Sequence, residues 1–482
     1  MEIIKLEKVN EVYNKVICEP GVGYEIKDHF TFKVPNYQFM PAYKNKLWDG
    51  NIYLFNPMNC LLYGGLTEQL EIFCKSRDYK LELLSDFSSD NMSVKETLDF
   101  VKSLNLPFQP REYQLEAFVR CVRSRRKMLL SPTGSGKSLI IYLLSRFYNL
   151  RTLIIVPTTS LIHQMSSDFL SYGYDDPDNI HKIYQGQDKN IKSQFVISTW
   201  QSIFKQSKDW FNQFDVVIGD EAHLFKAKSL TSIMTKLENC KYRFGFTGTL
   251  DGSETHQLVL EGLFGPVKKI ITTSELIEQK HLSNFMIKCI SLQYPDDIKK
   301  ECSKYSFQQE MDFLVSNQER NKFITNLSLS LKGNTLLLFQ YVDKHGKVLY
   351  DMISNEHSDK DIYFVHGGID GNEREKIRNI VEKNNNSIII ASYGTFSTGI
   401  NIKNLHNIIF SSPSKSKVRN LQSIGRGLRL SDNKEQAVLY DISDDLSWKE
   451  RKNFTLLHYI ERVKIYNEEQ FEYKTYKINI NT

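Results

Sequence analysis

A glycine-rich run that ends in Lys-Ser, residues 131–138 (SPTGSGKS), has the residue types and spacing that hold nucleotide phosphates. In such a run successive backbone N–H groups face phosphate oxygens, Lys137 adds a cation for the β- and γ-phosphates, and the Ser138 hydroxyl is a ligand for Mg²⁺. An apolar helix expected at 139–147 directs its positive N-terminal end at the same anion. The run predicts a site for ATP and Mg²⁺ that is formed by Thr133, Gly134, Ser135, Gly136, Lys137 and Ser138. Ser131 departs from the usual pattern, which has glycine at this position, and an ordinary strand-to-helix turn is the alternative.

Two adjacent carboxylates, Asp220 and Glu221, follow the apolar run 216–218. A parallel strand there would end at the sheet edge where ligands bind. Asp220 is suited to hold Mg²⁺, and Glu221 to orient and deprotonate the water that attacks the γ-phosphate. A solvated acidic turn is the alternative, and the phosphate loop upstream makes it the weaker one.

Length and composition indicate several folded domains. At 482 residues the chain exceeds a single core, and about 150 residues per domain suggests roughly three. The apolar content of 41% and charged content of 25% are ordinary for globular proteins. No apolar run reaches the ~18 residues of a membrane-spanning helix and no signal core is present, so we expect a soluble intracellular protein without a membrane partner. Seven scattered cysteines form no Cys-x-x-Cys pair, and a net charge of +5 permits nucleic acid without arguing for it.

Short β-branched runs alternate with helical stretches twice along the chain, which predicts two α/β units with parallel sheets. The first series lies at 153–156, 195–198, 216–218 and 242–246, and the second at 335–339, 362–365, 388–391, 408–410 and 437–440. Before them, Asp49-Gly50 predicts a hairpin turn in an aromatic-rich module, and 85–93 reads as a linker. After them, a helix is expected whose apolar stripe is Leu456, Leu457, Tyr459, Ile460 and Val463.

The order of these motifs resembles that of superfamily 2 helicases, over a stretch from Arg111 to Asp441. The carrying residues are the phosphate loop, Asp220-Glu221-Ala222-His223, Thr247-Gly248-Thr249, and residues 422–429 (QSIGRGLR). The resemblance implies an α/β fold with two tandem RecA-like domains, a small N-terminal α+β domain and a C-terminal helical extension. The expected boundaries are 1–100, 101–278, 279–445 and 446–482.

The same resemblance implies roles for further residues. Gln114 would read adenine, and His223 with Thr247 and Thr249 would link hydrolysis to domain movement. Gln422 would belong to the nucleotide site, while Arg426 and Arg429, three apart and so on one helical face, would reach the γ-phosphate as arginine fingers. Solvated surface arginines are the alternative to that last assignment.

A nucleic-acid track is implied across both units. Its expected contacts are Thr158, Thr159, Thr199 and Trp200 in the first unit, and Thr395 and Thr398 in the second. Hydroxyls and amides at loop tips suit phosphate contacts, whereas Trp200 is equally suited to stack a base or to lie in the core. Of two basic runs, 120–127 is read as a solvated helix end, and 415–419 is left open between a solvated loop and the strand path.

More narrowly, the chain resembles the phage recombination helicases, on the run 48–52, on 156–161 and 199–201, on 391–402 and on 473–480. That likeness implies an ATP-dependent DNA helicase acting on branched DNA and R-loops in recombination, repair and replication, in the cytoplasm of a host bacterium. Phage recombination and single-strand-binding proteins are the implied protein partners, and RNA:DNA hybrids a further substrate. An RNA helicase, a duplex translocase without strand separation, and a nucleotide-gated junction-binding protein remain alternatives. For the N-terminal module, branch recognition and a structural lid stay open, because residues 1–50 carry seven lysines against seven acidic residues.

Overall fold

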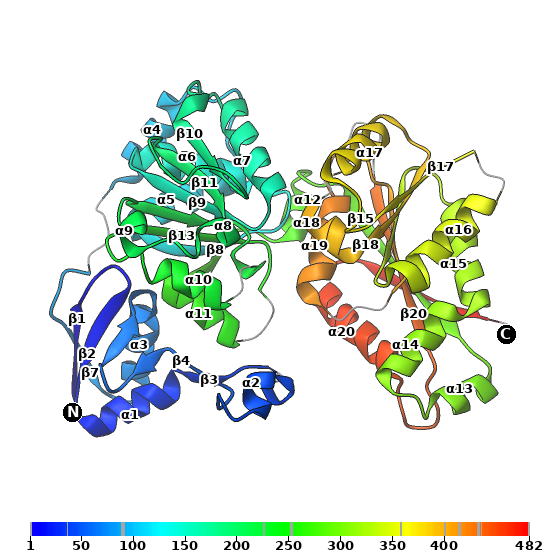
Figure 1. Cartoon of the computed structure of the whole chain (residues 1–482), viewed down its shortest axis with the longest axis horizontal. Helices are drawn as coiled ribbons and strands as arrows, with labels where there is room; N and C mark the ends of the chain where they lie inside the picture. Colours follow the sequence, from blue (N-terminus) through cyan, green and yellow to red (C-terminus); the bar gives the residue numbers. More distant parts are fainter. Residues whose placement is uncertain are drawn as a thin grey trace. The chain divides into compact units, whose positions relative to one another are not determined.

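The computed structural model describes residues 2–480 apart from 36, 88–91, 225–226, 251–253, 357–358, 400–401, 413–415, 431–433 and 435. The chain divides into two compact units (Figure 1). The first comprises Met1–Ser131 and Gly136–Ile270, and the second comprises Pro132–Ser135 and Ile271–Thr482.

The N-terminal module is a five-stranded sheet with two helices. The strands follow the order β5-β6-β2-β1-β7 and are Phe55–Asn56, Leu61–Tyr63, Tyr13–Ile17, Ile3–Lys8 and Lys80–Leu83. The helices are α1 (Pro20–His29) and α3 (Thr67–Ser76), and the 3₁₀ turn η2 (Gly64–Leu66) precedes α3. The sequence alternates along β1, so that Ile4 and Leu6 are buried while their neighbours face outward.

A small arm leaves this module between α1 and β5. Strand β3 (Thr31–Lys33) pairs antiparallel with β4 (Asn51–Tyr53), and the turn η1 (Tyr37–Phe39) and helix α2 (Pro41–Lys44) lie between them. The expected hairpin around Asp49-Gly50 is therefore wrong. Gly50 adopts a φ of +85° next to the Tyr37 ring and only leads the chain into β4, because the intervening residues fold onto that ring.

The first RecA-like domain has a seven-stranded sheet in the order β10-β11-β9-β12-β13-β8-β14, in which all described pairings are parallel. The strands are Ile180–Ile183, Phe195–Thr199, Thr152–Val156, Val216–Gly219, Tyr242–Thr247, Arg126–Leu130 and Val267–Lys269. One face is covered by α4 (Val94–Ser103), α5 (Glu112–Ser124), α6 (Lys137–Tyr148) and α7 (Thr159–Ser171). The other is covered by α8 (Trp200–Ile203), α9 (Lys208–Phe211), α10 (Ala227–Met234) and α11 (Glu254–Phe264).

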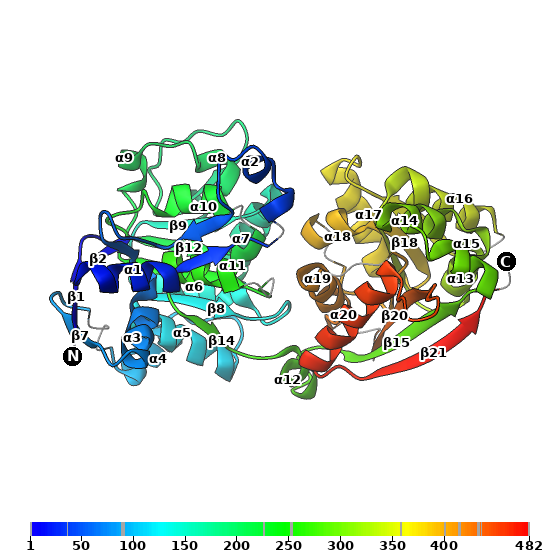
Figure 2. The same ribbon diagram turned by 90° about the horizontal axis from the view of Figure 1, so that it is seen from below.

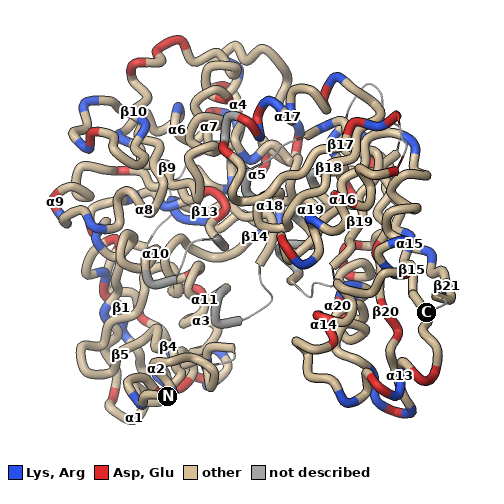
Figure 3. The backbone as a smooth tube through the Cα atoms, turned by 45° about the vertical axis from the view of Figure 1, so that its right-hand side comes forward, with Lys and Arg blue, Asp and Glu red and all other residues tan. Residues whose placement is uncertain are grey.

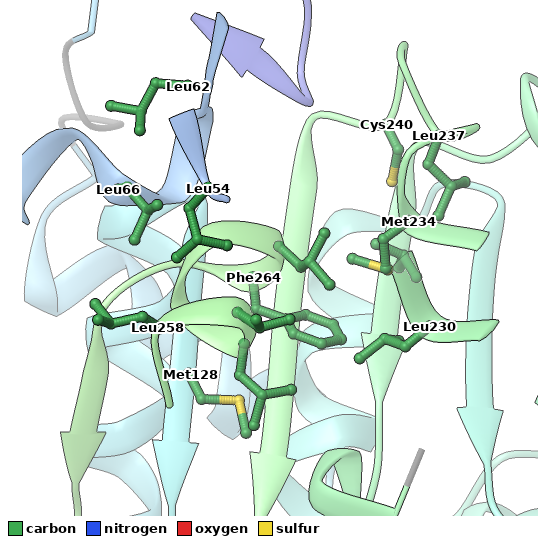
Figure 4. Packing of buried hydrophobic residues seen from close by; sticks show 14 of the residues in the cluster. Leu54, Leu62, Leu66, Met128, Leu230, Met234, Leu237, Cys240, Leu258 and Phe264 are labelled. Carbon is green, nitrogen blue, oxygen red and sulfur yellow. The ribbon is translucent and has the colours of Figure 1, made fainter. Parts of the chain in front are cut away.

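The N-terminal module shares its hydrophobic core with this second face. Figure 4 shows Leu54, Leu62 and Leu66 of the module in one apolar layer with Leu258 and Phe264 of α11.

Polar contacts also join the module to the first RecA-like domain. The Gln69 amide donates to Glu261 at 3.0 Å, the Glu11 N–H donates to the Glu238 carbonyl at 2.9 Å, and the Arg126 guanidinium donates to the Glu11 carbonyl at 2.8 Å. Burial and the nearby Arg243 lower the pKa of Arg126 to about 10. The module is thus an integral part of the first unit.

The second unit repeats the architecture with the strand order β17-β18-β16-β19-β20-β15-β21, again with parallel pairings. The strands are Asp361–Val365, Ser387–Ser392, Thr335–Phe339, Asn407–Phe410, Gln436–Asp445, Asn284–Gln293 and Tyr473–Asn479. In Figure 1, α15 and α16 lie on one side of this sheet, and α18 and α19 lie on the other. The helices are α12 (Thr273–Glu278), α13 (Asp296–Cys302), α14 (Phe307–Ser316), α15 (Gln318–Ser330), α16 (Lys347–Asn355), α17 (Gly371–Lys383), α18 (Tyr393–Gly399), α19 (Lys417–Gly427) and α20 (Phe454–Glu468).

The C-terminal segment is only partly helical, which corrects the expected helical extension. After α20 the chain forms β21, the edge strand beside β15, as Figure 2 shows along the lower rim of this unit. The expected stripe of α20 is only partly right. Four of its residues are half-buried and Leu457 is exposed, whereas the side chains of Arg462, Ile465 and Tyr466, outside the stripe, are buried. Arg462 forms an ion pair of 2.7 Å with Asp441 of β20, and the Tyr466 hydroxyl donates to the same carboxylate.

The predicted α/β class with two tandem RecA-like domains is confirmed, together with the positions of all nine predicted core strands. Lys/Arg and Asp/Glu are interspersed over both units in Figure 3, in keeping with 62 basic against 57 acidic residues in the sequence. Within the described residues, no helix is long and apolar enough to cross a lipid bilayer.

Candidate active site

The phosphate loop joins β8 to α6 at the carboxyl edge of the first sheet. Ser131, which replaces the expected glycine, is buried, and its N–H donates to the Thr247 carbonyl at 2.9 Å. Gly134 and Gly136 have φ values of +85° and +78°, in the left-handed region where a side chain is strained. The N–H groups at the start of α6, which have no partner within the helix, give this loop the character of an anion site.

Gln114 lies directly against this loop. A Cβ atom on Gly136 would come within 2.3 Å of the Gln114 Nε2 atom, so glycine is needed to admit the amide. The Gln114 Oε1 atom accepts the Arg111 N–H at 2.9 Å at the start of α5, which holds the buried side chain in place. The structure therefore brings together the residue assigned to adenine and the phosphate loop.

Lys137 and Glu221 face each other at the heart of the site. Their Nζ and Oε1 atoms are 3.2 Å apart, and Lys137 Nζ also donates to the Ser131 carbonyl at 3.3 Å. Asp220 follows β12, and its N–H donates to the Ile155 carbonyl while its Oδ1 atom accepts the Glu221 N–H at 3.0 Å. Glu221 has a φ of +48°, which is uncommon for a residue with a long side chain and typical of functional sites.

The electrostatics favour a bound cation. Burial, and then the charge of Glu221, raises the pKa of Asp220, while Lys137 partly opposes the rise. A second cation at this position would stabilise the ionised carboxylate. The described residues contain no group of three or more metal-ligating His, Cys, Asp or Glu side chains. A single carboxylate and the Ser138 hydroxyl nevertheless fit Mg²⁺, which usually keeps several waters and takes its other ligands from substrate phosphates.

His223 connects this acidic turn to the end of β13. Its Nδ1 atom forms a hydrogen bond with the Thr247 hydroxyl and lies 3.5 Å from Glu221 Oε2. The Thr247 hydroxyl also donates to the Thr249 carbonyl at 2.8 Å. The three residues expected to link hydrolysis to movement thus form a chain of contacts that reaches the predicted catalytic carboxylate through His223.

Sequence reasoning missed Tyr172, which caps the C-terminal end of α7. Its hydroxyl lies 2.7 Å from the Ser138 hydroxyl. The sequence gives no signal for this contact, because the two residues belong to different helices and no motif joins them.

The expected nucleic-acid residues of the first unit lie at the carboxyl ends of β9 and β11. Thr158 caps α7 by accepting the Leu161 N–H at 3.4 Å, and Thr159 is exposed. Thr199 is buried, and its hydroxyl is 2.9 Å from that of Ser202. Trp200 is half-buried and meets the Phe204 ring edge-on, so part of its surface belongs to the core.

In the second unit, Thr395 is buried with its hydroxyl 2.8 Å from that of Ser392. The side chains of Thr398, Gln422 and Arg426 lie outside the described part of the chain. Arg429 does not share a helical face with Arg426, because α19 ends at Gly427 and Arg429 stands two residues beyond it.

A buried lysine that the sequence did not single out secures this helix end. Lys434 Nζ donates to the Gly427 carbonyl at 2.8 Å and to the Lys403 carbonyl at 3.0 Å. Burial lowers the pKa of Lys434 to about 8. A cation at the C-terminal end of α19 stabilises carbonyls without helical partners, and so fixes the chain immediately before Arg429.

Only the first part of the basic run 120–127 is a solvated helix end, as predicted. Arg120 is partly exposed on α5 and pairs with Glu116 one turn away. Arg126 instead lies in β8, where its mostly buried side chain donates to the Glu11 carbonyl of the N-terminal module.

Comparisons with known proteins agree with this geometry. Three family models match: UvsW N-terminal domain at residues 4–84, type III restriction enzyme res subunit at 107–252, and helicase conserved C-terminal domain at 319–431. The ATP-dependent DNA helicase uvsW of Enterobacteria phage T4 is 35% identical over 97% of both chains. The DNA 3'-5' translocase XPB2 of Sulfurisphaera tokodaii is 26% identical over 69% of this chain and 81% of its own. The crystal structure of T4 UvsW matches with a TM-score of 0.52 and 33% identity over 99% of this chain and 100% of that chain.

Two RecA-like domains, a phosphate loop and an Asp-Glu-Ala-His turn joined to Thr247 define an ATP-dependent helicase of superfamily 2. Within that class, the chain belongs to the UvsW helicase family.

Proposed function

We propose that this protein is an ATP-driven DNA helicase that acts on branched DNA and R-loops. The observation that carries the proposal is the convergence of Lys137, Asp220 and Glu221 at one sheet edge, in a chain related over nearly its whole length to a DNA helicase. A nucleotide-gated protein that only clamps a junction would have no need of Glu221 beside the phosphate loop. A motor that hydrolyses ATP needs such a carboxylate.

The resting contact between Lys137 and Glu221 suggests how ATP prepares its own hydrolysis. Binding of the triphosphate draws the Lys137 ammonium towards the β- and γ-phosphates and away from Glu221 Oε1. The released carboxylate then orients and deprotonates the attacking water. Ser138 and Asp220 would hold Mg²⁺, which neutralises developing phosphate charge when bound. Arg426 and Arg429 are proposed to supply the remaining cations, and Gln114 and Gln422 to complete the nucleotide site.

The proposal also specifies DNA rather than RNA as the substrate. Thr158, Thr159, Thr199, Trp200, Thr395 and Thr398 are proposed to contact the strand, mainly through phosphates, which DNA and RNA share. Relatives differ in this respect: one is the DNA helicase of T4, while a putative ATP-dependent RNA helicase of Acanthamoeba polyphaga mimivirus is 26% identical over 66% of this chain. The full-length match favours DNA.

The deciding experiment measures steady-state ATPase activity with single strands, linear duplexes, forks, four-way junctions and RNA:DNA hybrids, followed by unwinding of matched DNA and RNA forks. We expect the strongest stimulation by forks and junctions of DNA. Equal stimulation and unwinding of RNA forks would favour the RNA helicase, and stimulation by duplex without strand separation would favour the translocase.

The arm, residues 31–53, is the part of the N-terminal module best suited to meet a branch point. It carries three lysines against one aspartate, although the first fifty residues are neutral as a whole. Phe39 and Leu47 are 68% and 81% exposed. Lys33 lies over the Tyr37 ring, and Tyr37 meets Tyr43 edge-on, so the arm is a small aromatic platform with basic edges. Such platforms stack unpaired bases and attract the adjoining backbone.

Phe39→Ala combined with Lys44→Ala tests this role of the arm. Stacking contributes about 1–3 kcal/mol per base, so fork affinity should fall by about fivefold or more while affinity for linear duplex changes little. Met58→Ala is the control, because Met58 is 93% exposed and lies outside the arm. If the ratio of fork affinity to duplex affinity is unchanged in the double variant, the arm has only a structural role.

A further inference from the structure

Tyr172 makes a contact that neither ATP hydrolysis nor nucleic-acid binding, as derived above, requires. Its hydroxyl is 2.7 Å from the hydroxyl of Ser138, the loop residue suited to ligate Mg²⁺. Ser138 is the second residue of α6, and Tyr172 directly follows the last residue of α7; β9 lies between the two helices. A hydroxyl pair of this length is a full hydrogen bond.

The surroundings hold the Tyr172 ring in one place. Tyr142 of α6 and Phe108, which precedes α5, both meet the ring edge-on at centroid distances of 5.5 Å. A tyrosine phenol carries its proton at neutral pH. A protonated phenol can donate to the Ser138 oxygen, which retains a second lone pair for a metal and its own hydrogen for a phosphate oxygen.

Helix α7 connects this contact to the expected strand-binding loop. Its first turn is capped by the Thr158 side chain at the carboxyl end of β9, and its last residues lead directly into Tyr172. The helix is packed along its buried face by Ile162, Met165 and Phe169. It therefore behaves as one rigid element between Thr158 and Tyr172.

We propose that Tyr172 is a positioning residue that orients the Ser138 hydroxyl for Mg²⁺ and, through α7, couples metal–nucleotide binding to the loop at Thr158. The second half of this statement rests on the proposed nucleic-acid role of that loop. The first half depends only on the contact with Ser138. Tyr172 itself touches neither metal nor phosphate.

The test compares Tyr172→Phe with the wild type by binding of a fluorescent ATP analogue, with saturating Mg²⁺ and with a chelator. Removing one hydrogen bond of this kind should reduce the Mg²⁺-dependent gain in affinity by about fivefold, while affinity without Mg²⁺ stays within twofold. Metal-free binding also reports whether the variant is folded. In a Ser138→Ala background, Tyr172→Phe should have no further effect.

Tyr174→Phe is the matched control. Its hydroxyl accepts the Asn179 side-chain amide at 3.1 Å at the same end of α7, away from Ser138. The proposal would be overturned if Mg²⁺ increased nucleotide affinity equally in the wild type, Tyr172→Phe and Tyr174→Phe. It would also be overturned if Tyr172→Phe lost the same affinity with and without Mg²⁺.

The coupling is tested by adding a single-stranded oligonucleotide to the same titration. We expect it to tighten nucleotide binding in the wild type and to do so less in Tyr172→Phe. If it has no effect even in the wild type, the proposed nucleic-acid role fails, while the Mg²⁺ titration still decides the role of Tyr172. If tightening is equal in both proteins, the coupling through α7 is refuted.

Discussion

Replacing Gly65 by alanine tests whether the N-terminal module is built into the first unit. Gly65 lies in the turn η2 against α11, where a Cβ atom would be 1.9 Å from the Glu261 carbonyl oxygen and 2.8 Å from that of Gly262. Real contacts of this kind essentially never fall below 3.0 Å, so the turn or the helix must move by at least 1.1 Å, the difference between these two distances. Both obstructing atoms belong to the backbone, and no side-chain rotation relieves the clash.

The loss of folding free energy in Gly65→Ala follows from the packing around this contact. Forcing extra atoms into a well-packed core costs about 1–3 kcal/mol, and here the displaced elements carry Leu66 and Leu258 of the shared apolar layer. For a unit of this size, each kcal/mol lowers the melting temperature by roughly 2–4 °C. Differential scanning calorimetry of Gly65→Ala should therefore show a transition of the first unit lowered by roughly 2–12 °C, with the second unit unaffected.

Gly21→Ala supplies the control. Gly21 lies in α1 with nothing within 4 Å of an added Cβ atom. Alanine is favoured over glycine in a helix by up to about 1 kcal/mol, so this variant should melt at the same temperature or slightly higher. An unchanged melting temperature for Gly65→Ala would refute the reasoning that module and helix form one packed body.

Three further predictions concern the site and the second unit. Lys137→Ala should abolish ATP turnover, whereas Glu221→Gln should retain ATP binding without turnover; near-normal turnover in the second would remove Glu221 as the base. Arg429→Ala should lower the rate on the order of 10³-fold by analogy with other arginine fingers, with nucleotide affinity, measured by fluorescence, largely kept. Burial, and then Arg320, lowers the pKa of His345 to about 3, so its neutral form stabilises the fold fully above pH 6.5 and progressively less as pH falls towards 3. At about 1.36 kcal/mol per pH unit, the free energy of unfolding should fall by about 2 kcal/mol between pH 6.5 and pH 5. In His345→Gln, urea unfolding should show a smaller decrease of this free energy over the same range.

The core strands were predictable because buried parallel strands are continuous apolar runs. The Thr335–Phe339 and Ser387–Ser392 strands are buried on both faces, and the sequence shows this directly. Strand β21 carries no such signal, since nearly all its residues are exposed at the sheet edge and two are lysines. Its pairing with β15 is decided by tertiary structure, which local patterns do not record.

Polar side chains in the core explain why the buried face of α20 was predicted only in part. An apolar period selects Leu456 and Leu457, but the helix is anchored by the buried ion pair of Arg462 with Asp441. Charged residues usually lie on the solvent face of a helix, but a charged residue that is paired can lie on the buried face. The adjacent carboxylates Asp220 and Glu221 and the phosphate loop were predictable because the chemistry expected of them fixes residue type and spacing. Tyr172 and Lys434 form hydrogen bonds with residues distant in the sequence or outside any motif, which sequence spacing does not reveal.

The shared core changes how branch recognition should be tested. Deleting residues 1–95 would uncover Leu258 and Phe264 of α11 and remove the partners of Arg126, so a loss of fork binding could come from damage to the first RecA-like domain. The β3–β4 pair forms a sheet of its own, and along the arm between its strands Phe39, Met40 and Leu47 are exposed. Point substitutions there leave the apolar layer intact. Because the arm belongs to the same packed unit as β8, α6 and the Asp220-Glu221 turn, whatever it binds is carried with that domain when ATP drives movement.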